Sequence, residues 1–177
     1  GSTDDTANQV QHIGDERIHY IWQTGSGSPA SPRNRGIVES KGEWVAFLDS
    51  DDSWLPGKLE HLAEVTMTST CELVSHCQEV QDSTGRTIAV MGNYRPHNVN
   101  YRTLLLTENV FATSSVALSR NFLERQNLRF NEAESYFGIE DYDLWLRVLA
   151  KGGRVMFIPK VLGINKLTDR HLGTTDL

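Results

Sequence analysis

The sequence of 177 residues has little cysteine, no long hydrophobic run and no surplus of positive charge. Its two cysteines, Cys71 and Cys77, lack the spacing of a zinc site, so we expect two thiols in or beside a buried strand of a cytosolic protein. No apolar stretch approaches the ~20 residues that a transmembrane helix needs. The net charge of −6 argues against a nucleic-acid partner, because such proteins usually carry a basic surplus.

The composition that is present suits one globular domain. Hydrophobic residues make up 38% of the chain and charged residues 23%, which is an ordinary balance for a folded protein. An acidic protein that handles an anionic substrate needs a local device for binding it, such as a metal ion or a helix N-terminus. The search for a site therefore begins with clusters of acidic residues.

Periodicity and turn residues predict an α/β domain with a mixed, mainly parallel sheet flanked by helices. Helices are expected at residues 3–13, 32–41, 57–68, 103–108, 121–126 and 140–151. Strands are expected at residues 17–23, 44–48, 73–80, 87–91, 112–118 and 155–164, the last interrupted by Pro159. The continuous apolar run at 44–48 indicates a central strand buried on both faces. Residues 82–85 should join two strands as a hairpin.

An acidic cluster, Asp49-Ser50-Asp51-Asp52, follows that apolar run directly. Ligands of open α/β sheets bind beyond the carboxyl ends of strands, and Mg²⁺ shares carboxylates with substrate phosphates. A solvated acidic turn would explain the same residues. A calcium loop does not fit, because its sixth position would be Trp54 where the turn needs glycine. An aspartate nucleophile of a phosphatase remains open from the local pattern alone.

Four segments together resemble family 2 glycosyltransferases of the GT-A fold. Residues 44–59 (WVAFLDSDDSWLPGKL) are similar to that family's signature. Residues 1–6 resemble the end of its "DDGSTDDT" turn, residues 32–36 its "ARNxG" helix and residues 138–147 its "xxEDxDLWLR" helix. The motifs occur in the family's order over nearly the whole chain, so the combination is specific.

The resemblance implies transfer of a sugar from a UDP-, GDP- or dTDP-sugar donor to a saccharide, lipid-linked or other hydroxyl acceptor, inverting and dependent on Mg²⁺ or Mn²⁺. It implies Asp49 and Asp51 as metal and nucleotide ligands, with Asp52 sharing the metal. Arg33 would contact the donor phosphates. Asp141 would be the general base, although first-turn acids such as this one also simply stabilise a helix.

Two further residue assignments have plain alternatives. The resemblance offers His171 as the family's late histidine, a third metal ligand, but the residues before it fit that pattern poorly and a histidine in a terminal tail explains it better. Trp54 and Trp145 are expected in the core or along the cleft.

The family pattern normally begins with an earlier strand, helix and strand. We therefore expect a domain that is incomplete at its N-terminus, with a partial nucleotide-binding half at residues 1–68 and an acceptor-side half at 69–177. An open sheet edge should then favour a homodimer and weaken donor binding. We expect a cytoplasmic location, peripheral to the membrane.

Two other functions remain as alternatives. The first is a non-catalytic remnant or interaction module, and the second is a phosphohydrolase built on Asp49 and Asp51. The sequence does not name the donor sugar, the nucleotide or the acceptor.

Overall fold

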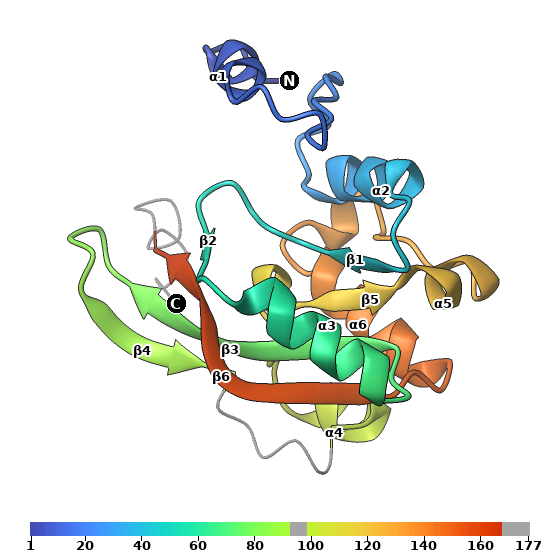
Figure 1. Cartoon of the computed structure of the whole chain (residues 1–177). Helices are drawn as coiled ribbons and strands as arrows, with labels where there is room; N and C mark the ends of the chain where they lie inside the picture. The colour runs from blue at the N-terminus through green and yellow to red at the C-terminus, as the bar shows by residue number, and fades with distance from the viewer. Residues whose placement is uncertain (93–98, 168–177) are drawn as a thin grey trace.

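A six-stranded sheet of order β1-β5-β3-β6-β2, with β4 paired to β3, organises this computed structural model, which describes residues 1–92 and 99–167 (Figure 1). The strands are β1 (Trp44–Ala46), β2 (Ser53–Trp54), β3 (Leu73–Gln81), β4 (Thr87–Met91), β5 (Ala117–Ser119) and β6 (Val155–Lys166). The expected mixed α/β class is confirmed. Among the described strands, however, only β3 and β6 pair in parallel, so the sheet is mainly antiparallel and not mainly parallel. The β3–β4 pair is a hairpin, and the parallel β3–β6 pair is possible because a long crossover connects its two strands.

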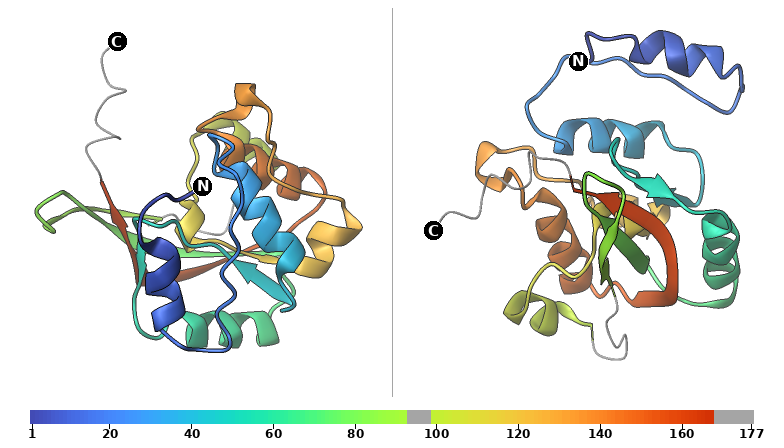
Figure 2. Two further views of the ribbon diagram at one scale, coloured as in Figure 1. Left: turned by 90° about the horizontal axis from the view of Figure 1, so that it is seen from above. Right: turned by 90° about the vertical axis from the view of Figure 1, so that its left-hand side faces the viewer.

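Helices cover both faces of the sheet (Figure 2). They are α1 (Thr6–His12), α2 (Ala30–Glu39), α3 (Lys58–Thr68), α4 (Tyr101–Leu106), α5 (Arg120–Arg125) and α6 (Glu140–Ala150), with 3-10 turns η2 (Thr113–Ser115) and η3 (Glu134–Tyr136). Helix α3 lies over one face, whereas α6 and α4 lie over the other. None of the helices within the described ranges is long and apolar enough to cross a membrane.

The main core lies between the sheet and α6. Helix α6 buries the apolar stripe predicted from its 3.6-residue period, and Gly152 follows it with a φ of 83° as a stop signal. Trp145 is 0% exposed and packs near the rings of Phe47 and Phe130, with centroids 6.2 and 5.9 Å away. Trp145 is therefore a core residue. This core joins residues from both sides of position 68, and the division into two halves stays a prediction.

A smaller core lies under α3. Val74 of β3 and two residues of β6, Ile158 and Leu162, pack there with Cys71. Cys71 and Cys77 are both buried free thiols, as expected, and burial raises the pKa of each thiol.

Strand β1 lies at an edge of the sheet and not at its centre. It pairs with β5, and the described residues supply no strand on its other side. Val45 and Phe47 are buried, but Leu48 is 47% exposed. The prediction of a central strand is thus wrong. The apolar run reflects the burial of Val45 and Phe47 in the α6 core, while Trp44 packs partly buried against the smaller core.

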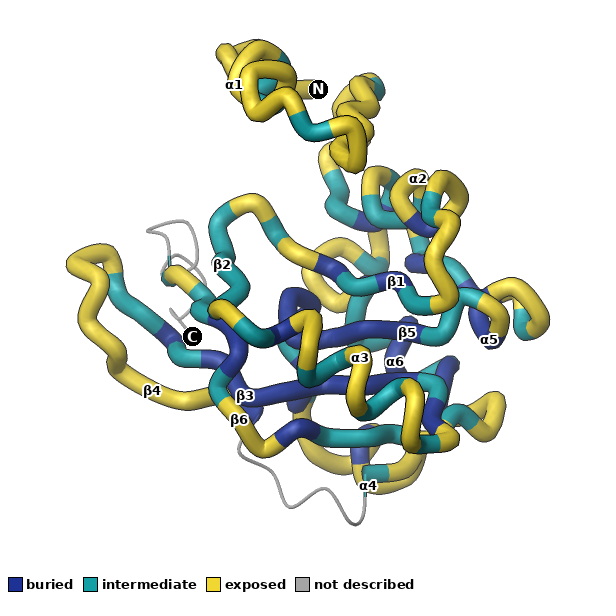
Figure 3. Tube along the Cα trace, in the orientation of Figure 1, coloured by how far each residue is buried: buried dark blue, intermediate teal, exposed yellow. Residues whose placement is uncertain are grey.

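Residues 1–29 form an exposed arm that contains α1 (Figure 3). No residue of this arm is buried, and residues 17–23 form no strand. The strand predicted there is wrong. An alternating segment needs a partner strand to satisfy its backbone groups, and the described residues provide none.

The β3–β4 hairpin is confirmed. Asp82 N–H donates to Arg86 O at 3.0 Å, and Gly85 adopts the φ of 83° that the turn requires. Strand β6 runs through Pro159 by a bulge: Ile158 lies opposite His76, whereas Val161 lies opposite Cys77. Proline has no N–H to donate, so it lies where the ladder is interrupted.

Candidate active site

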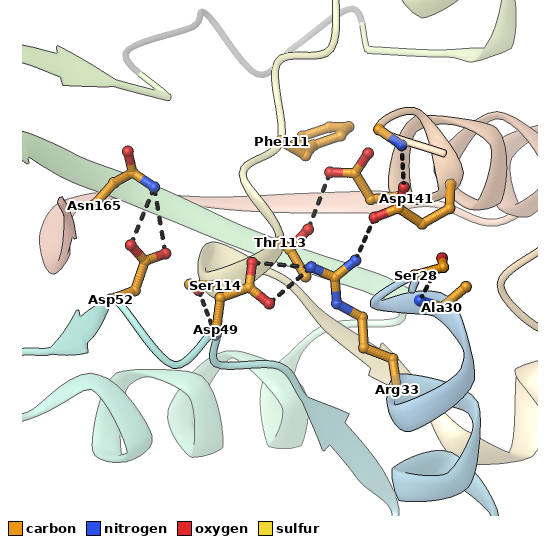
Figure 4. A network of polar contacts seen from close by, with 12 residues as sticks. Ser28, Ala30, Arg33, Asp49, Asp52, Phe111, Thr113, Ser114, Asp141 and Asn165 are labelled. Carbon is orange, nitrogen blue, oxygen red and sulfur yellow. Dashed lines mark hydrogen bonds and ion pairs between the residues drawn. The ribbon is translucent and has the colours of Figure 1, made fainter. Parts of the chain in front are cut away.

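The acidic loop begins where β1 ends. Its backbone turns sharply, with Asp52 N–H donating to Asp49 O at 3.1 Å. Asp49 N–H donates to the hydroxyl of Ser114 at 2.9 Å, which fixes the loop to η2 beside it (Figure 4). The loop therefore presents its carboxylates at the end of β1, which pairs with β5, and η2 holds the loop itself in place.

Arg33 of α2 joins two carboxylates from distant parts of the chain. Its Nη2 donates to Asp49 Oδ1 and Oδ2 at 2.7 and 2.9 Å, and its Nη1 donates to Glu140 Oε1 at 2.7 Å. The side chains of Arg33 and Glu140 are 13% and 6% exposed, whereas that of Asp49 is 35% exposed. Glu140 also accepts from Gly138 N–H at 2.9 Å. We call this trio the Arg33 clamp.

The Arg33 clamp gives Glu140 a role that the sequence analysis did not assign. In this structure both terminal nitrogens of Arg33 bind protein carboxylates, so a donor phosphate would have to share or displace them. Arg33 and Glu140 lie 107 residues apart in the sequence, so no local sequence pattern could indicate their contact. Only the resemblance to the family's motifs could have drawn attention to both residues.

The two other acids of the loop differ from Asp49 in their surroundings. Asp52 turns toward β6, where its carboxylate accepts from Asn165 Nδ2 at 3.1 and 3.3 Å and from Lys166 N–H at 3.2 Å (Figure 4). Burial raises the pKa of Asp52, and a hydrogen bond from Ser114 opposes the rise. Within the described parts of the chain, Asp51 forms no hydrogen bond or ion pair. Its carboxylate is the one most available to a ligand.

Asp141 lies in the first turn of α6 with three hydrogen-bond donors around its carboxylate. Thr113 Oγ1 donates to Oδ2 at 3.0 Å, Asn109 Nδ2 donates to Oδ2 at 3.2 Å and Tyr142 N–H donates to Oδ1 at 2.6 Å. Burial raises the pKa of Asp141, while the hydrogen bonds from Thr113 and Tyr142 partly offset the rise. A carboxylate with a raised pKa is a stronger base than an ordinary aspartate.

The 3-10 turn η2 connects the two acidic groups. Thr113 binds Asp141, and the next residue, Ser114, binds the backbone of Asp49. The carbonyl of Ser114 accepts from Trp54 Nε1 at 2.9 Å and from Lys58 Nζ at 2.7 Å. The strand expected at 112–118 begins only at residue 117 because these hydroxyls bind distant partners. Sequence reasoning missed Thr113 and Ser114.

Lys58 places a cation directly beneath this turn. It is 3% exposed, and its Nζ lies 3.9 Å from the centroid of the Trp54 ring. Burial lowers the pKa of Lys58 to about 7. Trp54 thus lies beside η2, with its ring against the amine of Lys58 and its N–H paired with the carbonyl of Ser114.

The carboxylates of the acidic loop could bind a divalent metal ion only if the substrate supplied further ligands to that ion. The described residues contain no group of three or more histidine, cysteine or acidic side chains that could hold a metal ion. Mg²⁺ nevertheless binds through one or two carboxylates together with substrate phosphates. Asp51 and Asp49 are suited to that arrangement. His171 lies outside the described residues, and the roles of all these residues stay predictions.

The fold and its strand-end acids define a class of protein, the GT-A glycosyltransferases. The fold matches S. aureus TarS 1-349 in complex with UDP at a TM-score of 0.73 and 19% identity, covering 97% of this chain and 50% of that one. The same protein in complex with UDP-GlcNAc matches at 0.73, covering 99% and 50%. The GT-A fold inferred from the motifs is confirmed.

Within that class, the chain belongs to glycosyl transferase family 2, whose model matches residues 1–127. The succinoglycan biosynthesis protein ExoO of Rhizobium meliloti is 30% identical over 89% of this chain and 47% of its own length. The UDP-Glc:alpha-D-GlcNAc-diphosphoundecaprenol beta-1,3-glucosyltransferase WfaP of Escherichia coli is 32% identical over 85% and 56%. The chain thus spans about half the length of these curated relatives.

Proposed function

We propose that this chain transfers a sugar from a nucleotide-sugar donor to an acceptor hydroxyl, with inversion at the anomeric carbon. The proposal depends on one observation: the 3-10 turn η2 binds both Asp141 and the acidic loop at residues 49–52. Thr113 and Ser114, adjacent in η2, bind the half-buried Asp141 and the acidic loop respectively. An inverting transfer needs these two centres, one base for the acceptor and one anchor for the leaving diphosphate, and no protein nucleophile.

Asp141 acts as the base in this proposal. It takes the proton of the acceptor hydroxyl while the acceptor oxygen forms a bond to the anomeric carbon. The bond between that carbon and the diphosphate breaks in the same displacement, and its electrons leave with the diphosphate. Arg33 and Glu140 hold the start of α6 against the loop, so the base and the anchor keep a fixed separation.

Asp51 and Asp49 would hold Mg²⁺ or Mn²⁺ with the donor diphosphate, and Asp52 would support the loop from the β6 side. When bound, the cation supplies positive charge that neutralises the diphosphate as it leaves. The lack of a partner for Asp51 within the described residues supports this role. Asp49 would give up one of its two hydrogen bonds from Arg33 to bind the metal ion.

The comparisons favour a UDP-sugar among the possible donors. A TarS structure was solved with UDP-GlcNAc, and the name of WfaP states a UDP-Glc donor and a diphosphoundecaprenol-linked acceptor. We therefore propose a UDP-sugar donor and a lipid-linked saccharide acceptor. An acceptor of this kind suits a protein on the cytoplasmic side and peripheral to the membrane.

Calorimetry with UDP, GDP and dTDP, each with and without Mn²⁺, tests the proposal. We expect UDP binding that depends on Mn²⁺ and that Asp51→Asn abolishes. Glu64→Gln is the matched control, because Glu64 is an acid on the neighbouring helix whose side chain is 73% exposed. Asp141→Asn should retain UDP binding and lose release of UDP from UDP-glucose.

Two outcomes would contradict the proposal. Absence of binding by all three nucleotides in a folded protein would favour a non-catalytic module. Metal-dependent release of phosphate from p-nitrophenyl phosphate, lost in Asp49→Asn, would favour the phosphohydrolase.

We also propose a homodimer through the open edge of β1. Phe47 N–H donates to Val116 O, so the neighbouring Ala46 N–H points to the opposite edge, which no strand of the described residues pairs. A groove of about 610 Å³ runs along that edge beside α2. Two copies could pair these edges about a two-fold axis. Light scattering should give a dimer that Ala46→Pro dissociates, and a wild-type monomer at high concentration would refute it.

A further inference from the structure

The two oxygens of the Asp141 carboxylate have different surroundings. Oδ2 accepts two side-chain hydrogen bonds. Thr113 Oγ1 donates at 3.0 Å (Figure 4), and Asn109 Nδ2 donates at 3.2 Å. Oδ1 accepts one backbone hydrogen bond, from Tyr142 N–H at 2.6 Å. The carboxylate is therefore held asymmetrically, with its side-chain donors gathered on one oxygen.

Both side-chain donors are themselves fixed in orientation. The Oδ1 of Asn109 accepts from Phe111 N–H at 3.2 Å, which turns the amide nitrogen toward Asp141. Thr113 is 6% exposed and belongs to η2, where Ser115 N–H donates to Ala112 O at 2.8 Å. Asn109 cannot turn away without losing its contact with Phe111, and the burial of Thr113 keeps its hydroxyl from solvent, so both constrain the carboxylate.

An ionised carboxylate offers about four lone-pair positions on its two oxygens. The three hydrogen bonds occupy two positions on Oδ2 and one on Oδ1, so one position on Oδ1 remains. We propose that Thr113 and Asn109 are positioning residues that saturate Oδ2 and leave Oδ1 as the atom that takes the acceptor proton. This proposal rests on the proposed role of Asp141 as base. The proton leaves the acceptor oxygen for Oδ1, and the freed electron pair forms the bond to the anomeric carbon.

The same hydrogen bonds act against the effect of burial on the base. Burial raises the pKa of Asp141, and neighbouring Glu140 raises it further, whereas Thr113, Tyr142 and Arg33 lower it. Loss of the Thr113 hydroxyl should thus raise the pKa of Asp141 and allow the carboxylate to rotate. The acid limb of the rate profile would then move to higher pH, because the base must be deprotonated to act.

The direct test follows the side-chain carboxyl carbon of Asp141 by ¹³C NMR as pH is varied, with the signal assigned from its absence in Asp141→Asn. Thr113→Val keeps the shape of the side chain and removes the hydroxyl, and it should raise the pKa of Asp141. Thr113→Ser should restore it. Asn109→Ala removes the other donor without altering the turn, so it provides a second measurement if Thr113→Val does not fold.

Ser115→Ala is the matched control. Ser115 lies in the same turn and is also buried, but its hydroxyl contacts Ser75 and Ala112 O and not Asp141. The pKa of Asp141 should not move in this variant. An equal rise in Ser115→Ala and Thr113→Val, or no rise in Thr113→Val and Asn109→Ala, would overturn the positioning role.

Turnover separates this inference from the proposed function. With UDP-glucose, Mn²⁺ and water as the acceptor, Thr113→Val should lower kcat by ~10- to 100-fold through misplacement of the base and leave KM for UDP-glucose little changed. If Asp141→Asn turns over like wild type, the proposed base is wrong. If Asp141→Asn is inactive while Thr113→Val keeps the wild-type kcat and pH profile, the base stands and the positioning role of Thr113 is wrong.

Discussion

Replacement of Arg33 by alanine should destabilise the fold as well as the site. The change leaves Glu140 without its cation while its side chain is 6% exposed. Removal of one partner of a buried ion pair costs about 3–5 kcal/mol, whereas the half-exposed Asp49 adds little because water screens it. A domain of this size loses roughly 2–4 °C of melting temperature per kcal/mol. We therefore expect Arg33→Ala to melt about 6–20 °C lower.

Differential scanning calorimetry of matched variants measures this effect. Arg35→Ala is the control, because Arg35 lies on the same helix but pairs with Glu39 at side-chain exposures of 54% and 43%. We expect that variant to change the free energy of unfolding by less than about 0.5 kcal/mol. Arg33→Lys should fall between the two, since a lysine lacks the fork that binds two carboxylates. Equal melting of Arg33→Ala and Arg35→Ala would refute the buried clamp.

Three more predictions concern stability. Burial lowers the pKa of Lys58 from 10.5 to about 7, so between these pH values the unfolded chain binds more protons than the folded one. The free energy of unfolding should therefore rise with pH over this range. Urea unfolding of Lys58→Met should show no such rise. Trp145→Ala should cost about 3–5 kcal/mol by leaving a core cavity, measured by the same method. Gly153→Ala should cost about 1–3 kcal/mol, because its Cβ would lie 2.7 Å from Val148 Cγ1; stability equal to wild type would show that the backbone yields.

The sequence predicts correctly the helices and strands that depend on neighbouring residues, such as turn residues and an apolar period. The β3–β4 hairpin follows from two alternating runs around Asp82 and Gly85, and the structure has both strands. Helix α6 follows from its apolar period and from Gly152, and it begins at Glu140 as expected. Its first-turn acids stabilise the helix N-terminus whether or not they have a catalytic role.

Elements whose causes are distant were predicted less well. An apolar run such as 44–48 does not say which strands lie beside it, so the edge position of β1 was missed. The turn at 113–115 forms because its hydroxyls bind Ser75, the acidic loop and Asp141, which come from three other parts of the chain. The Arg33–Glu140 pair has no sequence signal of its own. The strand-end acids follow from a local pattern and Asp141 follows from the resemblance, whereas the contacts that support them appear only in the structure.

The parallel pair of β3 and β6 has a consequence for how this chain acquires its fold. β6 lies between β3 and β2 in the sheet, although it is the last strand in the described sequence. The ladder that joins Leu73–Gln81 to Val155–Lys166 closes a loop across half of the chain. Such distant pairing slows folding, because chain entropy is lost before the contacts form. During synthesis, Asp52 would therefore gain its Asn165 contact only after more than a hundred further residues have left the ribosome.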